Sequence, residues 1–351
     1  MGDDLIELPR QPEGVDWPTD DWPLGEGFPR AATEAIDEMF EDHDRYERTF
    51  AVLVVHGGRL VFERYADVLE HWDGRSEQID RHTPLLSWSM AKSMLHAAVG
   101  IAVADGLLDI DAPARVAEWA DPNDPRRGIT LEHLLTMRDG LDFNEDYIDG
   151  ETSHVIEMLF GAGQSDVAGF AAARPLAVEP DTRFNYSSGT SNIIARLLGD
   201  AVAPTGIVTF LRERLFGPIG MHNADPRVDD AGTFVGSSYV YAPAREMAKF
   251  GLLYLRDGAW DGQRILPDGW VDHARRQRSW DPIDNVGYGA HWWTTDDELG
   301  TFRAAGYEGQ AIVICPAHDL VIVRLGKTDA VHGPALTAWR ERMVRAFDDP
   351  A

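Results

Sequence analysis

Residues 87–93 read SWSMAKS, and they open a segment whose apolar residues keep helical spacing to residue 105. Within it, Ser89 and Lys92 are three positions apart, so both side chains share one face of the predicted helix and the amine can reach the hydroxyl. A desolvated lysine can lose its proton near neutral pH and activate a serine. The free N–H groups of a helix start also favour a developing oxyanion. The stretch therefore predicts a nucleophilic serine.

The same pattern has a structural interpretation, in which the serine caps the helix and the lysine is exposed, because Ser-x-x-Lys often occurs by chance. The chain has only three lysines, at positions 92, 249 and 327, and one of them stands in this motif. That placement favours the catalytic interpretation.

Strands are predicted near both ends of the chain. Residues 50–56 are β-rich, Gly57-Gly58 suits a two-residue loop, and residues 59–65 return as a second strand. Further strands are predicted at 289–295, 302–305, 310–315 and 320–325, with a turn at 316–319. Helices are predicted at 31–43, 131–137, 191–202, 207–215, 244–255 and 334–347.

These elements predict an α+β fold, in which helices flank an antiparallel sheet built from both chain ends and a helical domain is inserted between them. We expect residues 1–30 to form a surface arm. Residues 31–88 and 286–351 are expected to form the sheet domain, and residues 89–285 the mainly helical insert, with the active site at their junction.

Composition restricts the possible functions. A length of 351 residues suggests about two domains. The formal net charge of −27 repels phosphate backbones, which argues against nucleic-acid binding. The single cysteine, Cys315, excludes an intramolecular disulfide and a thiolate zinc site. The first residues do not resemble a signal peptide, and no apolar stretch of about 18 residues is present. We therefore expect a cytoplasmic protein that does not associate with membranes.

Two more segments could carry chemistry. Residues 184–189 read FNYSSG and precede a helix, so Tyr186 could act as a general base if a nearby cation lowered its pKa. Residues 305–310 read AGYEGQ and begin an apolar strand, where glycines permit close backbone approach to a ligand. The alternatives are a tyrosine that packs at a loop–helix junction and a plain turn.

Together and in this order, the three segments resemble the serine β-lactamase and penicillin-binding-protein superfamily, in its class C-like branch of esterases and amidases. Ser89 to Lys92 matches the first family motif. Tyr186-Ser187-Ser188 stands where the family has Tyr-x-Asn, and residues 306–310 stand where it has Lys/His-x-Gly. The resemblance covers roughly residues 45–345.

The resemblance implies a serine hydrolase that acts through an acyl-enzyme on Ser89. Lys92 and Tyr186 would share the proton transfers, with Tyr186 protonating the leaving group. The oxyanion would lie between the backbone N–H groups of Ser89 and Gln310. Further substrate-binding residues would be Gly309, Ser188 and Tyr307. The substrate would be a small ester or amide, no metal or organic cofactor would be needed, and the protein would be a monomer or a homodimer.

Within the superfamily, residues 89–93 and 144–147 resemble most the 6-aminohexanoate-dimer (nylon-oligomer) hydrolases. That likeness implies that Tyr147 closes over the substrate and assists amide cleavage; otherwise it is a surface loop residue.

Two departures from the family pattern narrow the function. Ser188 replaces the asparagine of the second motif and shortens a donor to the substrate amide. Tyr307 replaces the lysine or histidine of the third motif, and Glu308 adds negative charge nearby. Loss of that cation argues against a β-lactamase or a D-Ala carboxypeptidase. The departures also motivate a rival interpretation, a catalytically silent binding or sensor protein that keeps the fold.

Overall fold

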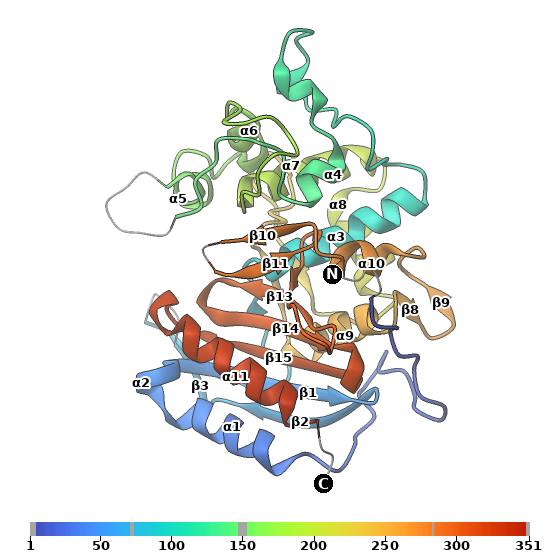
Figure 1. The fold of residues 1–351 in the computed structure, drawn as a ribbon, viewed down its shortest axis with the longest axis vertical. Helices are drawn as coiled ribbons and strands as arrows, with labels where there is room; N and C mark the ends of the chain where they lie inside the picture. The colour runs from blue at the N-terminus through green and yellow to red at the C-terminus, as the bar shows by residue number, and fades with distance from the viewer. Residues whose placement is uncertain (1–4, 71–73, 147–152, 283, 349–351) are drawn as a thin grey trace.

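The computed structural model describes residues 5–70, 74–146, 153–282 and 284–348. Its centre is an eight-stranded antiparallel sheet with the strand order β10-β11-β12-β13-β14-β15-β1-β2 (Figure 1). Strands β1 (Arg48–His56) and β2 (Arg59–Tyr65) come from the N-terminal part of the chain, and the other six come from the C-terminal part. The predicted fold class is confirmed.

The N-terminal hairpin forms as predicted. His56 pairs with Arg59, and Gly57 and Gly58 close the turn with positive φ values of 57° and 73°. Other L-residues rarely adopt this conformation, which explains the glycine pair. Strand β1 also pairs along its length with β15 (Leu320–Lys327), so the two chain ends meet inside the sheet.

The C-terminal half of the sheet contains β10 (Ser279–Asp281), β11 (Val286–Tyr288), β12 (Trp293–Thr294), β13 (Phe302–Gly306) and β14 (Gln310–Cys315). The single strand predicted at 289–295 is wrong. The chain turns there, because His291 has a φ of 56° and Gly289 lies so close to α10 (Trp270–Arg275) that a Cβ would be 2.0 Å from the carbonyl oxygen of Ala274.

Helices cover both faces of the sheet. On one face, α1 (Arg30–Glu41), α2 (His43–Tyr46) and α11 (Gly333–Arg345) bury a core with alternate residues of β1, β14 and β15. On the other face, α9 (Ala244–Leu255) packs so closely that a Cβ on Gly251 would be 2.6 Å from Val321.

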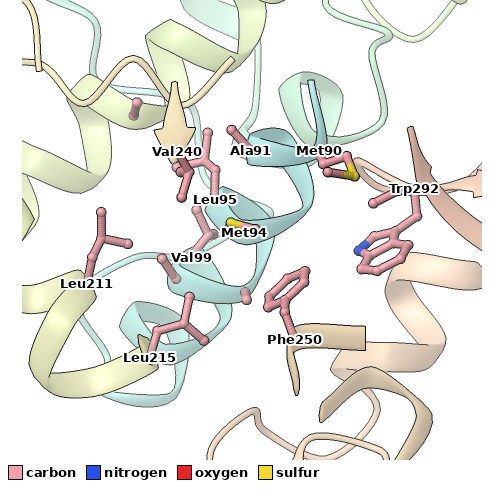
Figure 2. Packing of buried hydrophobic residues seen from close by; sticks show 14 of the residues in the cluster. Met90, Ala91, Met94, Leu95, Val99, Leu211, Leu215, Val240, Phe250 and Trp292 are labelled. Atoms are coloured by element: carbon pink, nitrogen blue, oxygen red, sulfur yellow. The ribbon is translucent and has the colours of Figure 1, made fainter. Parts of the chain in front are cut away.

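Helix α3 (Met90–Ala104) lies inside this second layer and is buried on almost all sides. Figure 2 shows Met94, Leu95 and Val99 of α3 among side chains of other elements, including Phe250 and Trp292. A helix that is apolar all round belongs in a core, and this burial fixes the position of residues at its N-terminus.

The remaining helices lie in the middle of the chain. They are α4 (Leu131–Leu135), α5 (His154–Phe160), α6 (Val167–Ala172), α7 (Ser188–Ala201) and α8 (Ile207–Phe210), which continues as a π-helical turn (Leu211–Phe216). Those that begin at residues 131, 188 and 207 fall where helices were predicted, with shifted ends, and the other two were not predicted. Short strand pairs complete the fold: β3 (Val68–Glu70) with β4 (Ser76–Gln78), β5 (Leu85–Leu86) and β6 (Asp225–Pro226) with β7 (Val240–Ala242), and β8 (Ala259–Trp260) with β9 (Gln263–Arg264). The large sheet begins at Ser279, ahead of the domain boundary expected at residue 286.

The N-terminal arm is fastened to the body by a few side chains. Trp17 packs on Trp260 with ring centroids 5.1 Å apart, and Trp22 is buried. The Lys249 Nζ donates a hydrogen bond of 3.0 Å to the carbonyl oxygen of Thr19. Within the part of the chain that the structure describes, no helix is long and apolar enough to cross a membrane.

Candidate active site

Ser89 stands immediately before α3, at the N-cap position. The preceding residue, Trp88, has a positive φ of 45°, and the hydroxyl of Ser87 accepts a hydrogen bond of 3.2 Å from the N–H of Val240 on β7. The turn at Ser87–Ser89 is thus held by β7 before the nucleophile and by α3 after it. The Ser89 side chain makes no capping hydrogen bond, so the interpretation of this residue as a plain helix cap is wrong.

Lys92 is buried, with 1% of its surface exposed, which also excludes the exposed lysine of that alternative. Its Nζ donates to Ser89 Oγ at 3.0 Å, to Ser188 Oγ at 2.9 Å and to the carbonyl oxygen of Ser237 at 3.1 Å. Burial lowers the pKa of the amine to about 8, although the charge of Glu145 acts in the opposite direction. About one tenth of the amine is therefore neutral at pH 7 and can accept a proton.

Tyr186 lies on the other side of the nucleophile and is hydrogen-bonded to the Ser89 side chain. Lys92 Nζ lies 4.7 Å from the centroid of its ring. Burial, followed by the charge of Glu145, raises the pKa of the phenol, and the hydrogen bond with Ser89 only partly opposes this. The lowered pKa that the sequence suggested for this tyrosine is therefore wrong. Tyr186 is a phenol at neutral pH, which suits a proton donor better than a base.

Glu145 is a site residue whose role the sequence reasoning missed. Its two carboxylate oxygens accept hydrogen bonds from the N–H of Ser188 at 2.6 Å and from the Ser188 hydroxyl at 2.5 Å. Ser188 is the first residue of α7, where a carboxylate is favoured by the helix dipole. Because Lys92 donates to the same hydroxyl, Lys92, Ser188 and Glu145 form one hydrogen-bonded chain. Ser188 was predicted to contact substrate, but its hydroxyl already accepts a hydrogen bond from Lys92 and donates one to Glu145.

In the third motif, the Gln310 side chain is engaged away from the nucleophile, and the oxyanion role predicted for the Gln310 N–H stays a prediction. Gln310 is buried, and its side-chain amide pairs with the backbone of Gly326 on β15, at 2.6 and 2.9 Å. A Cβ on Gly309 would lie 2.7 Å from Arg324, on the α11 side of the sheet. A Cβ on Gly306 would instead lie 2.5 Å from the carbonyl oxygen of Ser87. The β13–β14 hairpin is tight, so Gly306 adjoins the nucleophile turn, while the side chains of residues 309 and 310 are turned away.

A cavity of about 170 Å³ opens beside Ser89. It is lined mainly by large apolar side chains, together with two serines: Trp88, Ser89, Ile156, Leu159, Phe160, Ser238 and Tyr307. The carboxylate of Glu308 accepts a hydrogen bond of 3.1 Å from Trp88 Nε1. Among the described residues that line this cavity, none is charged. A wider hollow of about 620 Å³ lies beside Asp121 and Arg126 and holds none of the predicted catalytic residues.

Tyr147 lies outside the described residues, so its role stays a prediction. Two adjacent tryptophans point in different directions: Trp292 is buried in the core, and Trp293 packs on Tyr186 with ring centroids 5.1 Å apart. His291 is structural. Its ring nitrogens bond to the carbonyl oxygen of Leu135 at 2.8 Å and to the Ser191 hydroxyl at 3.0 Å.

A serine at the start of a buried helix, with its lysine one turn on and a tyrosine opposite, is the arrangement of the penicillin-recognising serine hydrolases. The fold and the resemblance found in the sequence lead to the same class. The family model described as Beta-lactamase matches residues 36–346, and the chain belongs to this family.

Its relatives include a protein named as a 6-aminohexanoate-dimer hydrolase. It is 27% identical, over 79% of this chain and 72% of the relative, to the 6-aminohexanoate-dimer hydrolase of Paenarthrobacter ureafaciens. A solved structure from Bacillus anthracis, provisionally named a 6-aminohexanoate-dimer hydrolase, superposes with a TM-score of 0.77 at 20% identity, covering 98% of this chain and 91% of that one. A family VIII carboxylesterase superposes with a TM-score of 0.68 at 16% identity, covering 90% and 96%. These two structures show the shared fold.

Proposed function

We propose that the protein is a serine hydrolase that cleaves carboxylic esters and small amides through an acyl-enzyme on Ser89. The observation that carries this proposal is the hydrogen bond of 3.0 Å between Lys92 Nζ and Ser89 Oγ, made by a buried amine whose pKa is lowered to about 8. Burial of a lysine destabilises its charged form, and here the buried amine is hydrogen-bonded to a serine hydroxyl that lines a cavity.

The chemistry follows from the protonation states of the three groups. Neutral Lys92 takes the proton of Ser89 while Oγ attacks the substrate carbonyl carbon. The N–H of Ser89 at the helix start stabilises the oxyanion, and the adjoining segment at Gly306 and Tyr307 is our candidate for the second donor. Tyr186, a phenol at neutral pH, donates its proton to the leaving oxygen or nitrogen and is reprotonated through Lys92. Water then attacks the acyl group, and the same residues carry the protons in reverse.

The cavity supports a substrate with a neutral, apolar acyl group. Its 170 Å³ would hold about five or six volumes the size of a water molecule, at about 30 Å³ each. That space suits an acyl chain of a few carbons. The uncharged lining offers no partner to a carboxylate. Esters should be the easier substrates, because an alkoxide leaves more readily than an amide nitrogen; the named activity of the Paenarthrobacter relative supports the amide activity.

Covalent labelling tests the proposal and separates the enzyme from a silent binding protein. A fluorophosphonate probe should label the wild-type chain at Ser89, and p-nitrophenyl butanoate should be hydrolysed. Ser89→Ala should abolish both while the fold is kept, because this side chain makes no capping bond. Ser165→Ala, at an exposed serine, is the matched control. Turnover retained by a folded Ser89→Ala protein, or a wild-type chain that is neither labelled nor active, would refute the assignment.

A further inference from the structure

Three arginines converge between the large sheet and α11, on the face opposite the nucleophile helix. Phe302 and Ala304 of β13 belong to the core on the α3 side, so Arg303 between them points to the α11 side. On β15, Val323 and Leu325 belong to the α3-side core in the same way, so Arg324 also faces α11.

The sheet register leaves room between these two side chains. Ala305 pairs with Ala311, and Ala311 pairs with Arg324. Arg303 itself pairs with Val313, so Arg303 and Arg324 are two strand spacings of about 4.8 Å apart across the sheet and two residues, about 6.8 Å, apart along it. At the level of Arg324, only alanine methyl groups rise from the two neighbouring strands.

Helix α11 runs across this face of the sheet (Figure 1) and supplies the third arginine. Leu336 of α11 reaches the β13–β14 turn, since a Cβ on Gly309 would lie 2.5 Å from its Cδ1. Arg340 is one helical turn further on, along the same side of α11.

The cluster lacks close carboxylates. Across the described ranges, no carboxylate oxygen lies within 4.0 Å of a guanidinium nitrogen of Arg303, Arg324 or Arg340, whereas most surface arginines have such a partner. The Nε atoms of Arg303 and Arg324 are buried without a hydrogen-bond partner in this structure. The other two nitrogens of Arg324 donate to neutral oxygens, those of Glu308 O, Arg48 O, Thr49 Oγ1 and Thr328 Oγ1. A buried arginine cluster without a close carboxylate is unusual in a chain with 59 acidic and 32 basic residues.

The electrostatics agree with an uncompensated cluster. Burial lowers the pKa of Arg324 and of Arg340 to about 9 and that of Arg303 to about 10. Arg303 and Arg324 lower the pKa of Arg340 further by repulsion. The acidic residues that act on the cluster from a longer distance are Asp284, Glu341, Glu308 and Glu47. Guanidinium groups that repel one another in a partly dry site are stabilised by an anion between them.

We infer that Arg303, Arg324 and Arg340 bind a small inorganic anion, phosphate or chloride, between β13–β15 and α11. The guanidinium fork suits oxyanions, and the unpartnered Nε atoms are donors that such an ion can satisfy. Arg324 also donates a hydrogen bond of 2.9 Å to the carbonyl oxygen of Glu308, so the bound ion would lie directly behind the turn whose Tyr307 lines the substrate cavity.

Thermal unfolding at constant ionic strength tests this site without using activity. Sodium gluconate, whose anion is bulky, is replaced stepwise by sodium phosphate or by sodium chloride. The wild-type Tm should rise saturably by about 2–4 °C with the anion that binds. Arg340→Met should show no such rise, because Arg340 would be one of the ion's three ligands. Within the described part of the chain, the half-buried Arg340 makes one hydrogen bond, to Thr337 Oγ1, so its loss leaves the other contacts intact. In gluconate alone, this variant should be at least as stable as wild type, since one repelling charge is removed.

Arg30→Met, at an arginine whose side chain is 92% exposed, is the control for general salt effects and should follow wild type. Parallel rises in wild type and Arg340→Met would overturn the proposal. Calorimetric titration of the wild-type protein with each salt tests directly, without any variant, whether the anion binds. Saturable binding of one ion by wild type supports the site, and no heat of binding from either salt in the range where Tm was measured refutes it.

Discussion

Glu145 acts on Lys92 through Ser188, so Glu145→Gln should shift the pH dependence of catalysis. The two hydrogen bonds that meet at Ser188 Oγ, of 2.9 and 2.5 Å, place the carboxylate within about 6 Å of the amine. A negative charge at that distance stabilises the ammonium form and raises the pKa of Lys92, against the lowering by burial. Glutamine keeps the shape and removes the charge, and its single carbonyl oxygen can accept one of the two hydrogen bonds that Ser188 donates. The pKa of Lys92 should therefore fall below its wild-type value of about 8, by about one unit or more.

The assay is kcat/KM for p-nitrophenyl butanoate between pH 5 and 9. The reaction needs the neutral amine, whose fraction rises with pH, so wild-type activity should rise along a limb near pH 8. In Glu145→Gln the limb should move to lower pH by about one unit. The activity at pH 7, expressed as a fraction of the high-pH plateau of the same variant, should then be about fivefold larger than for wild type. The position of the limb does not depend on the height of the plateau, so a moderate loss of geometry does not obscure the result.

Glu213→Gln, at an exposed acid, controls for the loss of one negative charge from the whole chain. A limb that stays at the wild-type pH in Glu145→Gln, or that moves upward, would show that the carboxylate does not set the protonation of Lys92. A limb that moves equally in both variants would assign the shift to net charge instead of this contact.

Three further outcomes follow from the geometry. On one activated ester, Lys92→Ala and Tyr186→Phe should each remove most of kcat/KM, and the double variant should lose little more, because both groups serve the same hydroxyl; losses that simply multiply would contradict this. Gly306→Ala should lower kcat/KM about tenfold or more with the fold retained, since its Cβ would meet the backbone just before the nucleophile; unchanged kinetics would argue against this segment as part of the site. Burial lowers the pKa of His291 in the folded protein from 6.5 to about 3. Between pH 6.5 and pH 3 the unfolded chain therefore binds a proton at this residue and the folded protein does not, so stability is lost as the pH falls. Urea unfolding should show His291→Gln losing about 1 kcal/mol less per pH unit than wild type between pH 6 and 4, and identical slopes would exclude this origin.

The sheet and the nucleophile helix could be predicted because their signals are local. The Gly57-Gly58 pair sets the first hairpin through its positive φ values, and the apolar periodicity of residues 89–105 follows α3 almost to its ends. The break in the strand predicted at 289–295 could not be predicted, because it depends on the close packing of Gly289 on α10.

Spacing alone predicts a contact in the site only where one motif holds both residues, whereas Tyr186 was predicted from the resemblance to the family pattern. Ser89 and Lys92 are one helical turn apart, so their contact follows from spacing. Glu145 meets Ser188 across 43 residues, and no local pattern indicates that a loop carboxylate accepts from the first residue of α7. The wall of the cavity is equally non-local, since Ile156 and Phe160 of α5 reach the nucleophile only through the tertiary fold.

The two departures from the family pattern are connected through charge. A third motif with lysine or histidine would place a second cation near the nucleophile, but this chain has Tyr307 there. Glu145 compensates the ammonium form of Lys92 through Ser188. A serine hydroxyl suits this position because it can accept from the amine and donate to the carboxylate at once. A substrate that carries a carboxylate near its scissile bond would find no cation among the described residues that line the cavity, and the carboxylate of Glu308 lies behind Trp88. Under the proposed function, the substitutions that would disfavour β-lactams would therefore favour a neutral acyl group, while the hydrogen bond between Lys92 and Ser89 is kept.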